Sequence, residues 1–230
     1  MRYIIVGLGN FGASLAVTLT SQGHEVIGID VDMDKVDHYK ESVSHTICMD
    51  STNERAVSGL PIDNTDVVLI TIGEDQGQNV MVTALFKNLN AKRLISRAIN
   101  PLHQKVLEAI GVDDIIAPEY EAATHWSKKL SLHGIIDSFE LSKDYSIVEV
   151  KTPPAFYGKT VADLDLKNLF NVMLLTTISF HKSQFGFGKG QDKTVINGLA
   201  SPDTVIQPDT LLVLFGETQD LKRLFKHMQK

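Results

Sequence analysis

The sequence predicts an α/β protein: a doubly wound parallel sheet with a second, smaller α+β domain. Apolar, β-branched runs alternate with stretches of helical periodicity up to about residue 135, and this alternation indicates a parallel sheet with helices on both faces. Beyond Gly134 the pattern changes to short strands, proline breaks and turn sequences. We therefore expect two domains, residues 1–135 and residues 136–230.

The elements of the first domain follow from its apolar runs and from the residues that end them. Strands are expected at residues 3–6, 26–30, 45–49, 66–72, 93–98 and 112–117. Helices are expected at residues 13–21, 32–41, 53–60, 78–90, 101–110 and 119–132. The run 66–72 is almost wholly apolar, which is typical of a central strand buried on both faces.

The second domain has a less regular pattern. Strands are expected at residues 139–141, 146–150, 171–178 and 210–215, and helices at residues 161–170 and 218–227. A glycine- and polar-rich segment, residues 182–197, interrupts them. It is predicted either to pack on a partner or to form a loop.

A glycine motif stands between the first strand and the first helix, because Gly7, Gly9 and Gly12 follow the G-x-G-x-x-G spacing. Asp30 ends the next strand and completes the context that the motif needs. Gly7 permits a sharp turn, Gly9 lets a pyrophosphate approach the backbone, and Gly12 lets the helix pack closely on the sheet. Free N–H groups and the helix dipole then favour phosphate. The motif predicts a nucleotide site on a Rossmann-like sheet; a glycine turn that only packs is the alternative.

The position and charge of Asp30 indicate which class of nucleotide binds. Asp30 is placed to accept hydrogen bonds from ribose hydroxyls, and its charge repels a 2′-phosphate, so NAD, ADP or ATP fits better than NADP. Strands one and four of such a sheet flank the binding crevice, so the glycine motif and residues 71–74 should face each other across it.

Composition excludes several classes of protein. The net charge of −6 and the pI of about 5.7, with no basic run, argue against a nucleic-acid partner. The single cysteine, Cys48, excludes an internal disulfide and a cysteine zinc cluster. The chain enters a strand at once, without a signal peptide, and its apolar runs are too short to span a bilayer. We expect a soluble intracellular protein.

Seven stretches together carry a resemblance to a known family. They are residues 4–12, 23–30, 50–52, 106–113 and 118–119 in the first part, and residues 156–164 and 201–213 in the second. They resemble the RCK proteins (regulator of conductance of potassium), the cytosolic nucleotide-binding subunits of Trk- and Ktr-type potassium uptake systems. The resemblance covers essentially the whole chain, and residues 201–213 are the more telling because ordinary dehydrogenases lack such a stretch.

The resemblance implies a regulatory function without chemistry. Proteins similar to this one form homodimers and then an octameric ring beneath a membrane-spanning potassium transporter or channel, so the chain is expected to be cytoplasmic and peripheral to the inner face of the cell membrane. Exchange of ADP and ATP, or binding of NAD or NADH, changes the shape of the ring and gates ion flow. Two alternatives stay open: an NAD-dependent oxidoreductase on the same fold, and a nucleotide sensor for another ion transporter. The absence of a Tyr-x-x-x-Lys pair argues against the enzyme.

The resemblance also implies contacts for each part of the nucleotide. The phosphates are expected at Gly7, Gly9, Asn10, Phe11 and Gly12, the ribose at Asp30, the adenine at Asp50 and Ser51, and the opposite wall at Thr71, Ile72 and Gly73. Arg97 would supply a cation to the phosphates, and Glu119 would bind a divalent cation or sodium.

Simpler readings accompany some of these residues. Arg97 could form a surface ion pair, Glu119 could stabilise the helix dipole, and Asp50 could be a cap. One departure from the family concerns Asn10, where ATP-binding members often carry Arg. Because an uncharged amide removes an anchor for a third phosphate, ADP or NAD gains ground over ATP.

Overall fold

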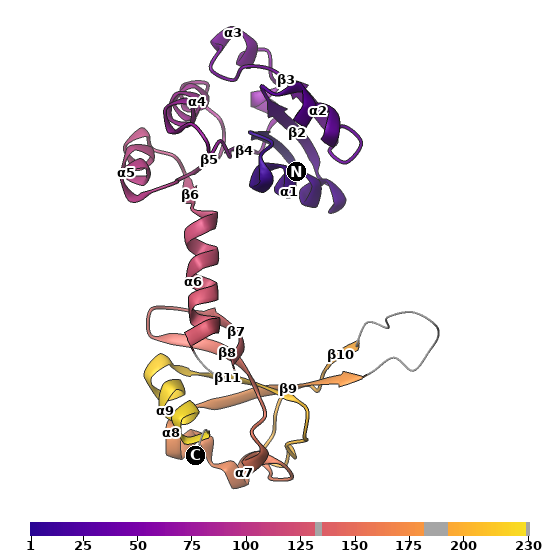
Figure 1. The fold of residues 1–230 in the computed structure, drawn as a ribbon, viewed down its shortest axis with the longest axis vertical. Coiled ribbons are helices and arrows are strands. Elements are labelled where there is room, and N and C mark those ends of the chain that lie inside the picture. Colours follow the sequence, from indigo (N-terminus) through magenta and orange to yellow (C-terminus); the bar gives the residue numbers. More distant parts are fainter. Residues whose placement is uncertain (132–134, 182–192, 229–230) are drawn as a thin grey trace. The chain divides into compact units, whose positions relative to one another are not determined.

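The computed structural model describes residues 1–131, 135–181 and 193–228. Residue contacts divide the chain into two compact units, Met1–Ala122 and Ala123–Lys230 (Figure 1). This division falls inside helix α6 (Pro118–Ser131). The domain boundary after residue 135, which the sequence pattern indicates, stays a prediction. No helix within the described ranges combines the length and apolar character that crossing a membrane requires.

The first unit contains a parallel sheet of six strands. They are β1 (Arg2–Val6), β2 (Glu25–Asp30), β3 (His45–Cys48), β4 (Val67–Ile70), β5 (Leu94–Arg97) and β6 (Asp114–Ile116). Their order is β3-β2-β1-β4-β5-β6, and every neighbouring pair is parallel. The chain winds outward in both directions from β1 and β4, so their carboxyl ends flank the switch point where such folds bind ligands. The predicted doubly wound sheet is confirmed.

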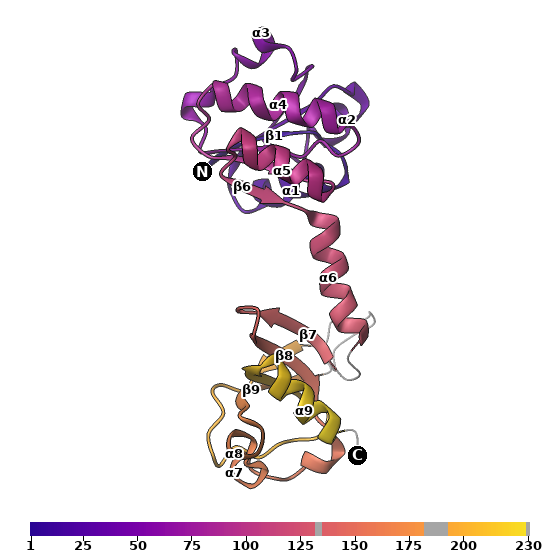
Figure 2. The same ribbon diagram turned by 90° about the vertical axis from the view of Figure 1, so that its left-hand side faces the viewer.

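Helices cover both faces of this sheet. The helices that connect its strands are α1 (Asn10–Ser21), α2 (Met33–Tyr39), α3 (Glu54–Val57), α4 (Gln76–Asn88) and α5 (Pro101–Ile110), with a 3-10 turn, η1 (Ile62–Asn64). Ala13 and Ala16 of α1 pack with Val36 of α2 in one apolar cluster, while Val82 and Phe86 of α4 belong to another. Figure 2 shows α4 and α5 side by side, in agreement with their contacts.

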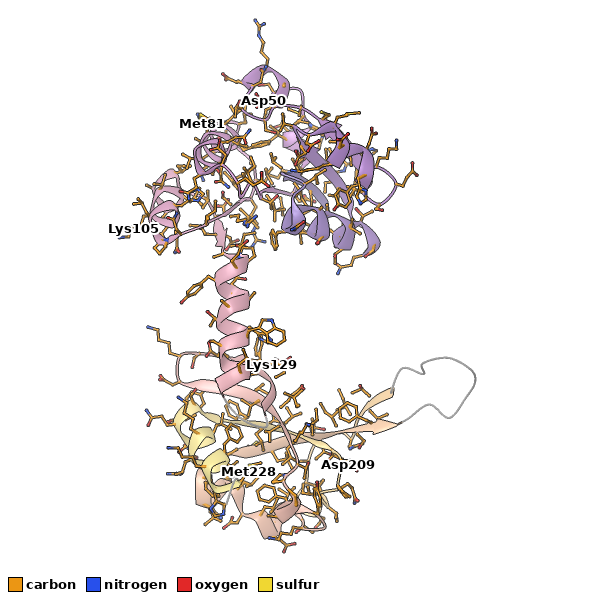
Figure 3. All side chains as sticks on the ribbon, in the orientation of Figure 1. Asp50, Met81, Lys105, Lys129, Asp209 and Met228 are labelled. Atoms are coloured by element: carbon orange, nitrogen blue, oxygen red, sulfur yellow. The ribbon has the colours of Figure 1, made fainter. Side chains whose placement is uncertain are left out.

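The outer faces of these helices are polar or exposed. Met81 on α4 and Lys105 on α5 point away from the sheet (Figure 3). By contrast, all four residues of β4 are buried, as expected for a central strand. α3 is shorter than predicted, because Gly59 and then Pro61 interrupt the helical pattern after Val57.

The second unit contains an antiparallel sheet of five strands in the order β10-β9-β11-β8-β7. The strands are β7 (Ile135–Glu140), β8 (Tyr145–Lys151), β9 (Met173–His181), β10 (Lys193–Ile196) and β11 (Leu211–Glu217). The 3-10 turn η2 (Pro154–Phe156) and the helices α7 (Val161–Leu164), α8 (Leu166–Phe170) and α9 (Thr218–Met228) complete the unit. Leu221, Leu224 and Phe225 of α9 pack against Leu212 and Leu214 of β11 in its main core.

Two features of this unit differ from the sequence prediction. The helix expected over residues 161–170 is two short helices, because Asp165 adopts a left-handed conformation with φ of 44°. A capping box of Thr160 and Asp163 fixes the first of them. The end of the polar segment 182–197 forms strand β10, paired with β9, while residues 182–192 lie outside the described residues.

Candidate functional site

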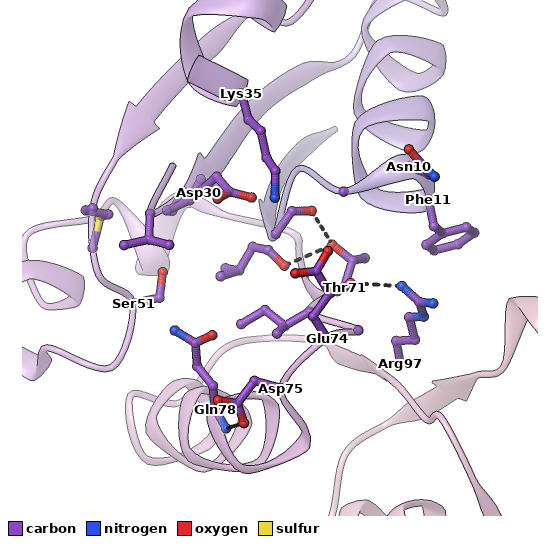
Figure 4. A pocket seen from close by; sticks show the side chains of 18 of the residues that line it. Asn10, Phe11, Asp30, Lys35, Ser51, Thr71, Glu74, Asp75, Gln78 and Arg97 are labelled. Carbon is purple, nitrogen blue, oxygen red and sulfur yellow. Dashed lines mark hydrogen bonds between the residues drawn. The ribbon is translucent and has the colours of Figure 1, made fainter. Parts of the chain in front are cut away.

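A cavity of about 430 Å³ opens in the first unit at the carboxyl ends of β1, β2, β4 and β5 (Figure 4). One wall is the glycine motif, through Gly7, Gly9, Asn10 and Phe11. Thr71, Ile72 and Gly73 line the cavity as well, and so do Asp30, Ser51, Arg97 and Glu119. Eleven of the thirteen residues predicted for the site thus meet at one cavity; Gly12 and Asp50 are not among its lining residues.

Glycine serves a different structural purpose at each of the three positions of the motif. Gly7 has φ of 101°, a left-handed conformation, and a Cβ there would lie 3.0 Å from the backbone nitrogen of Ile72. A Cβ on Gly12 would overlap the carbonyl oxygen of Gly7 and the hydroxyl of Thr71. A Cβ on Gly9 would meet no atom within 4 Å, although Gly9 lines the cavity. Gly9 therefore leaves open space on the cavity side, whereas Gly7 and Gly12 permit close packing.

Thr71 fastens the glycine motif to the end of β4. Its hydroxyl lies 2.9 Å from the carbonyl oxygen of Val6 and 2.7 Å from that of Gly7, and it can donate to one of them at a time. Its backbone N–H also donates to the Val6 carbonyl at 2.8 Å. Thr71 is 2% exposed. The sequence predicts Thr71 in the opposite wall, but no local pattern indicates that its side chain also holds the glycine turn.

Asp30 holds the other side of the turn. One carboxylate oxygen accepts the backbone N–H of Leu8 at 2.7 Å, and the other accepts that of Asp32 at 2.9 Å. A carboxylate has about four lone-pair positions, so Asp30 keeps acceptor capacity beyond these two bonds. The side chain can therefore organise the backbone and still accept hydrogen bonds from a diol in the cavity.

The first turn of α1 faces the same cavity. Gly9 occupies the N-cap position, no side chain caps the helix, and the first turn carries no acidic residue. The N–H groups of the first turn of a helix have no partners within the helix, so they are available to an anion. This arrangement matches the phosphate cradle that the spacing of the glycines predicts.

Arg97 and Glu119 form an ion pair at the cavity. The Arg97 side chain is 16% exposed and packs beneath Gly73, where a Cβ would lie 2.7 Å from the Cζ atom of the guanidinium. Its Nη1 lies 3.4 Å from the carbonyl oxygen of Thr71, and its buried Nε has no hydrogen-bond partner among the described residues. Arg97 thus forms an ion pair, the alternative to phosphate binding that the sequence allowed, and it also lines the cavity.

The predicted adenine residues occupy different positions. Ser51 is 5% exposed and lines the cavity. The Asp50 carboxylate instead accepts the backbone N–H of Thr52 at 2.9 Å and its hydroxyl at 2.7 Å, and these bonds lower the pKa of Asp50. The cap of α3 is Asn53, not Asp50. A contact between Asp50 and adenine stays a prediction.

The described residues give Glu119 few protein partners with which to bind a metal ion. Across the described residues, no three His, Cys, Asp or Glu side chains are grouped so that they could hold a metal ion. Glu119 could supply one oxygen, and phosphate oxygens would have to supply others.

Several residues that line the cavity were not predicted from the sequence. Lys35 reaches the cavity from α2, and Met49 and Gln78 line it as well. None belongs to a recognised motif. The rule that ligands bind beyond the carboxyl ends of the strands could have found Lys35, because it lies five positions after the end of β2.

Comparisons with known proteins agree with this architecture. The family model of the TrkA-N domain matches residues 3–118. The Ktr system potassium uptake protein C of Bacillus subtilis (strain 168) is 30% identical over 227 residues, which make up 99% of this chain and 97% of that protein.

Two solved structures share the fold over both units. The crystal structure of the GsuK RCK domain has a TM-score of 0.64 at 17% identity, covering 100% of this chain and 48% of that one. The GsuK channel bound to NAD has a TM-score of 0.60 at 17% identity, covering 96% of this chain and 38% of that one. At such identities the likeness shows the fold.

Proposed function

The chain belongs to the TrkA-N domain family and is a relative of the Ktr potassium uptake proteins, and from this premise we propose that it is the nucleotide-sensing regulatory subunit of a membrane potassium transporter. An adenine nucleotide binds in the cavity of the first unit and shifts the balance between two shapes of the assembly. The observation that carries the proposal is the meeting of the glycine motif, Asp30 and Thr71 around one cavity at the switch point of the sheet.

The chemistry of the cavity supports an adenine nucleotide. The uncapped first turn of α1 and the open space at Gly9 suit the phosphates, and the spare acceptors of Asp30 suit the ribose. Ser51 and the apolar side chain of Met49 suit the base. Asn10 offers no positive charge for a third phosphate, so ADP or NAD (as NAD or NADH) is preferred over ATP, and the charge of Asp30 disfavours NADP.

Arg97 and Glu119 take different parts in this proposal. Arg97 contributes a cation to the phosphates once its pairing with Glu119 is exchanged or shared. Glu119 then contributes to a divalent cation or sodium bound beside the nucleotide.

The partner and the assembly are inferred from relatives. The Ktr relative that this chain matches over 99% of its length is a potassium uptake protein. We infer that the chain forms a homodimer and then an octameric ring in the cytoplasm, beneath a membrane-spanning transporter subunit. No nucleic-acid partner is proposed, in keeping with the net charge of −6.

Calorimetric titration of the purified protein with ADP, ATP, NAD, NADH and NADP tests the ligand. We expect ADP or NAD to bind more tightly than ATP, and NADP to bind weakly. Failure of every adenine compound to bind at millimolar concentration would reject the proposal.

Two further assays test the function. Potassium uptake by a co-reconstituted membrane subunit should change when the preferred nucleotide is added. Reduction of NAD over candidate substrates should show no turnover, and steady turnover would favour an oxidoreductase instead.

A further inference from the structure

We propose that Lys35 binds the 5′-phosphates of the adenosine ligand and so makes the cavity selective for a charged nucleotide over a neutral nucleoside. The inference rests on the proposed function, because it requires an adenine nucleotide in this cavity. Lys35 lies in the first half of α2 and lines the cavity. Figure 4 shows its side chain extending from α2 into the cavity beside Asp30.

The charges around the cavity are unevenly matched. Of the described residues that line it, the basic ones are Lys35 and Arg97. The acidic ones are Asp30, Glu74, Asp75 and Glu119. An anion entering this cavity therefore meets more negative than positive side chains, and it needs a cation that is free to approach it.

Arg97 is already occupied. Its guanidinium is paired with Glu119, and a bond to the Thr71 carbonyl holds it beneath Gly73. Lys35, in contrast, forms no ion pair and no side-chain hydrogen bond with another described residue. Its ammonium group is thus the available cation, and its flexible stem lets it follow a phosphate.

The position of Asp30 favours contact of Lys35 with the 5′-phosphates over contact with a 2′-phosphate. Both oxygens of Asp30 accept backbone N–H groups, so Asp30 stays fixed at the ribose end of the cavity. A 2′-phosphate on that ribose would meet the Asp30 carboxylate, whereas 5′-phosphates lie toward the glycine motif. The glycine motif itself supplies N–H groups but no charge, since Asn10 carries an amide. Lys35 supplies the positive charge that this cradle lacks.

The test is calorimetric titration of the full chain with ADP and with adenosine at low and moderate salt. Lys35→Met keeps the aliphatic stem and removes the charge. It should weaken ADP binding about tenfold and leave adenosine binding unchanged, because only ADP carries the phosphates. It should also reduce the dependence of ADP affinity on salt.

Two variants serve as controls. Lys35→Arg keeps the charge and should retain most of the affinity for ADP. Lys40→Met removes a lysine just beyond α2 that is paired with Asp37 at 3.2 Å and does not line the cavity, so it should bind both ligands like the wild type.

Several results would overturn the inference. Equal losses for ADP and adenosine in Lys35→Met would mean a structural effect, and unchanged ADP affinity would mean no contact. Loss of affinity for adenosine 2′-phosphate with ADP affinity intact would place Lys35 at the ribose 2′ position instead. If the wild type bound neither ADP nor any other adenine compound, the proposed function itself would fail, which separates the two failures.

Discussion

The carboxylate of Asp30 accepts a 2.7 Å hydrogen bond from the backbone N–H of Leu8, which lies 22 residues earlier in the chain. Its second oxygen accepts the N–H of Asp32 at 2.9 Å. One buried side chain at the end of β2 therefore fixes the glycine motif that follows β1 and also the segment that leads into α2. Asp30 therefore has a structural role in addition to its proposed contact with the ribose.

Replacing Asp30 tests both roles. Asp30→Ala should weaken binding of adenine nucleotides by about 1–3 kcal/mol, through lost charge-assisted hydrogen bonds to the ribose. It should also lower the free energy of unfolding by about 1–3 kcal/mol, because the Leu8 N–H loses its acceptor. Titration and urea unfolding measure the two effects. Unchanged nucleotide affinity would contradict the ribose assignment.

Two glycine variants separate packing from ligand access. Gly12→Ala places a methyl group against the Gly7 carbonyl and Thr71, so it should lower the free energy of unfolding by about 1–3 kcal/mol. Gly9→Ala meets open space, so the free energy of unfolding should fall by no more than about 1 kcal/mol, the cost of alanine at an N-cap position. The Gly9 variant should nevertheless weaken ADP binding about tenfold, since the methyl group enters the path of the phosphates.

Gly59→Ala is the matched control for these variants. A Cβ there lies 3.4 Å from its nearest neighbour, the carbonyl oxygen of Ala56, and Gly59 does not line the cavity. Stability and ADP affinity should both resemble the wild type. Normal ADP binding by Gly9→Ala would argue against a phosphate cradle at this turn.

Glu119→Gln should reveal competition for Arg97. In buffer with a chelator, the variant should bind ADP about threefold to tenfold more tightly, because the guanidinium is freed for the phosphates. Stability should change by only about 0–1 kcal/mol, since the Glu119 side chain is 66% exposed. With Mg²⁺ present the gain should disappear if Glu119 helps to hold the ion. Identical titrations of variant and wild type in both buffers would remove Glu119 from the site.

His103 predicts a pH dependence of stability. It is 3% exposed, and neither ring nitrogen has a hydrogen-bond partner among the described residues. Burial lowers the pKa of His103 in the folded protein below its ordinary value of 6.5. As the pH falls below 6.5, the unfolded chain therefore takes up a proton before the folded one does, and stability declines toward the folded pKa.

His103→Leu should reduce this decline. Urea unfolding at about pH 7.5 and about pH 5 should show a smaller loss of stability in the variant than in the wild type. His45→Gln, at an exposed position of β3, should leave the wild-type decline in place. An equal decline in all three proteins would mean that other groups control the acid limb.

The sequence predicted the parts of the fold that local patterns determine. The apolar runs located every strand of the parallel sheet, and the glycine spacing with Asp30 located the cavity, because these signals lie within a few tens of residues. The break at Asp165 was missed, since a left-handed conformation at Asp leaves little trace in an apolar pattern.

The remaining features depend on tertiary contacts. Nothing local indicates that Arg97 pairs with Glu119 or that Thr71 reaches back to Gly7. Lys35 was overlooked because a single lysine on a polar helix looks like ordinary surface. The spacing of residues 50–52 also gave no sign that the Asp50 carboxylate accepts the backbone N–H of Thr52, and its contact with adenine stays a prediction.

The bonds that Thr71 and Asp30 make to the glycine turn bear on how fast a ligand is captured. The glycine turn is already held by Thr71 and Asp30, so ligand binding does not have to order it. Little conformational entropy is therefore lost on association. Capture should then be limited mainly by diffusion and orientation, and differences between ligands should appear as differences in residence time. Such a receptor would respond quickly when the ligand concentration rises. When the concentration falls, the rate of ligand dissociation would limit its response.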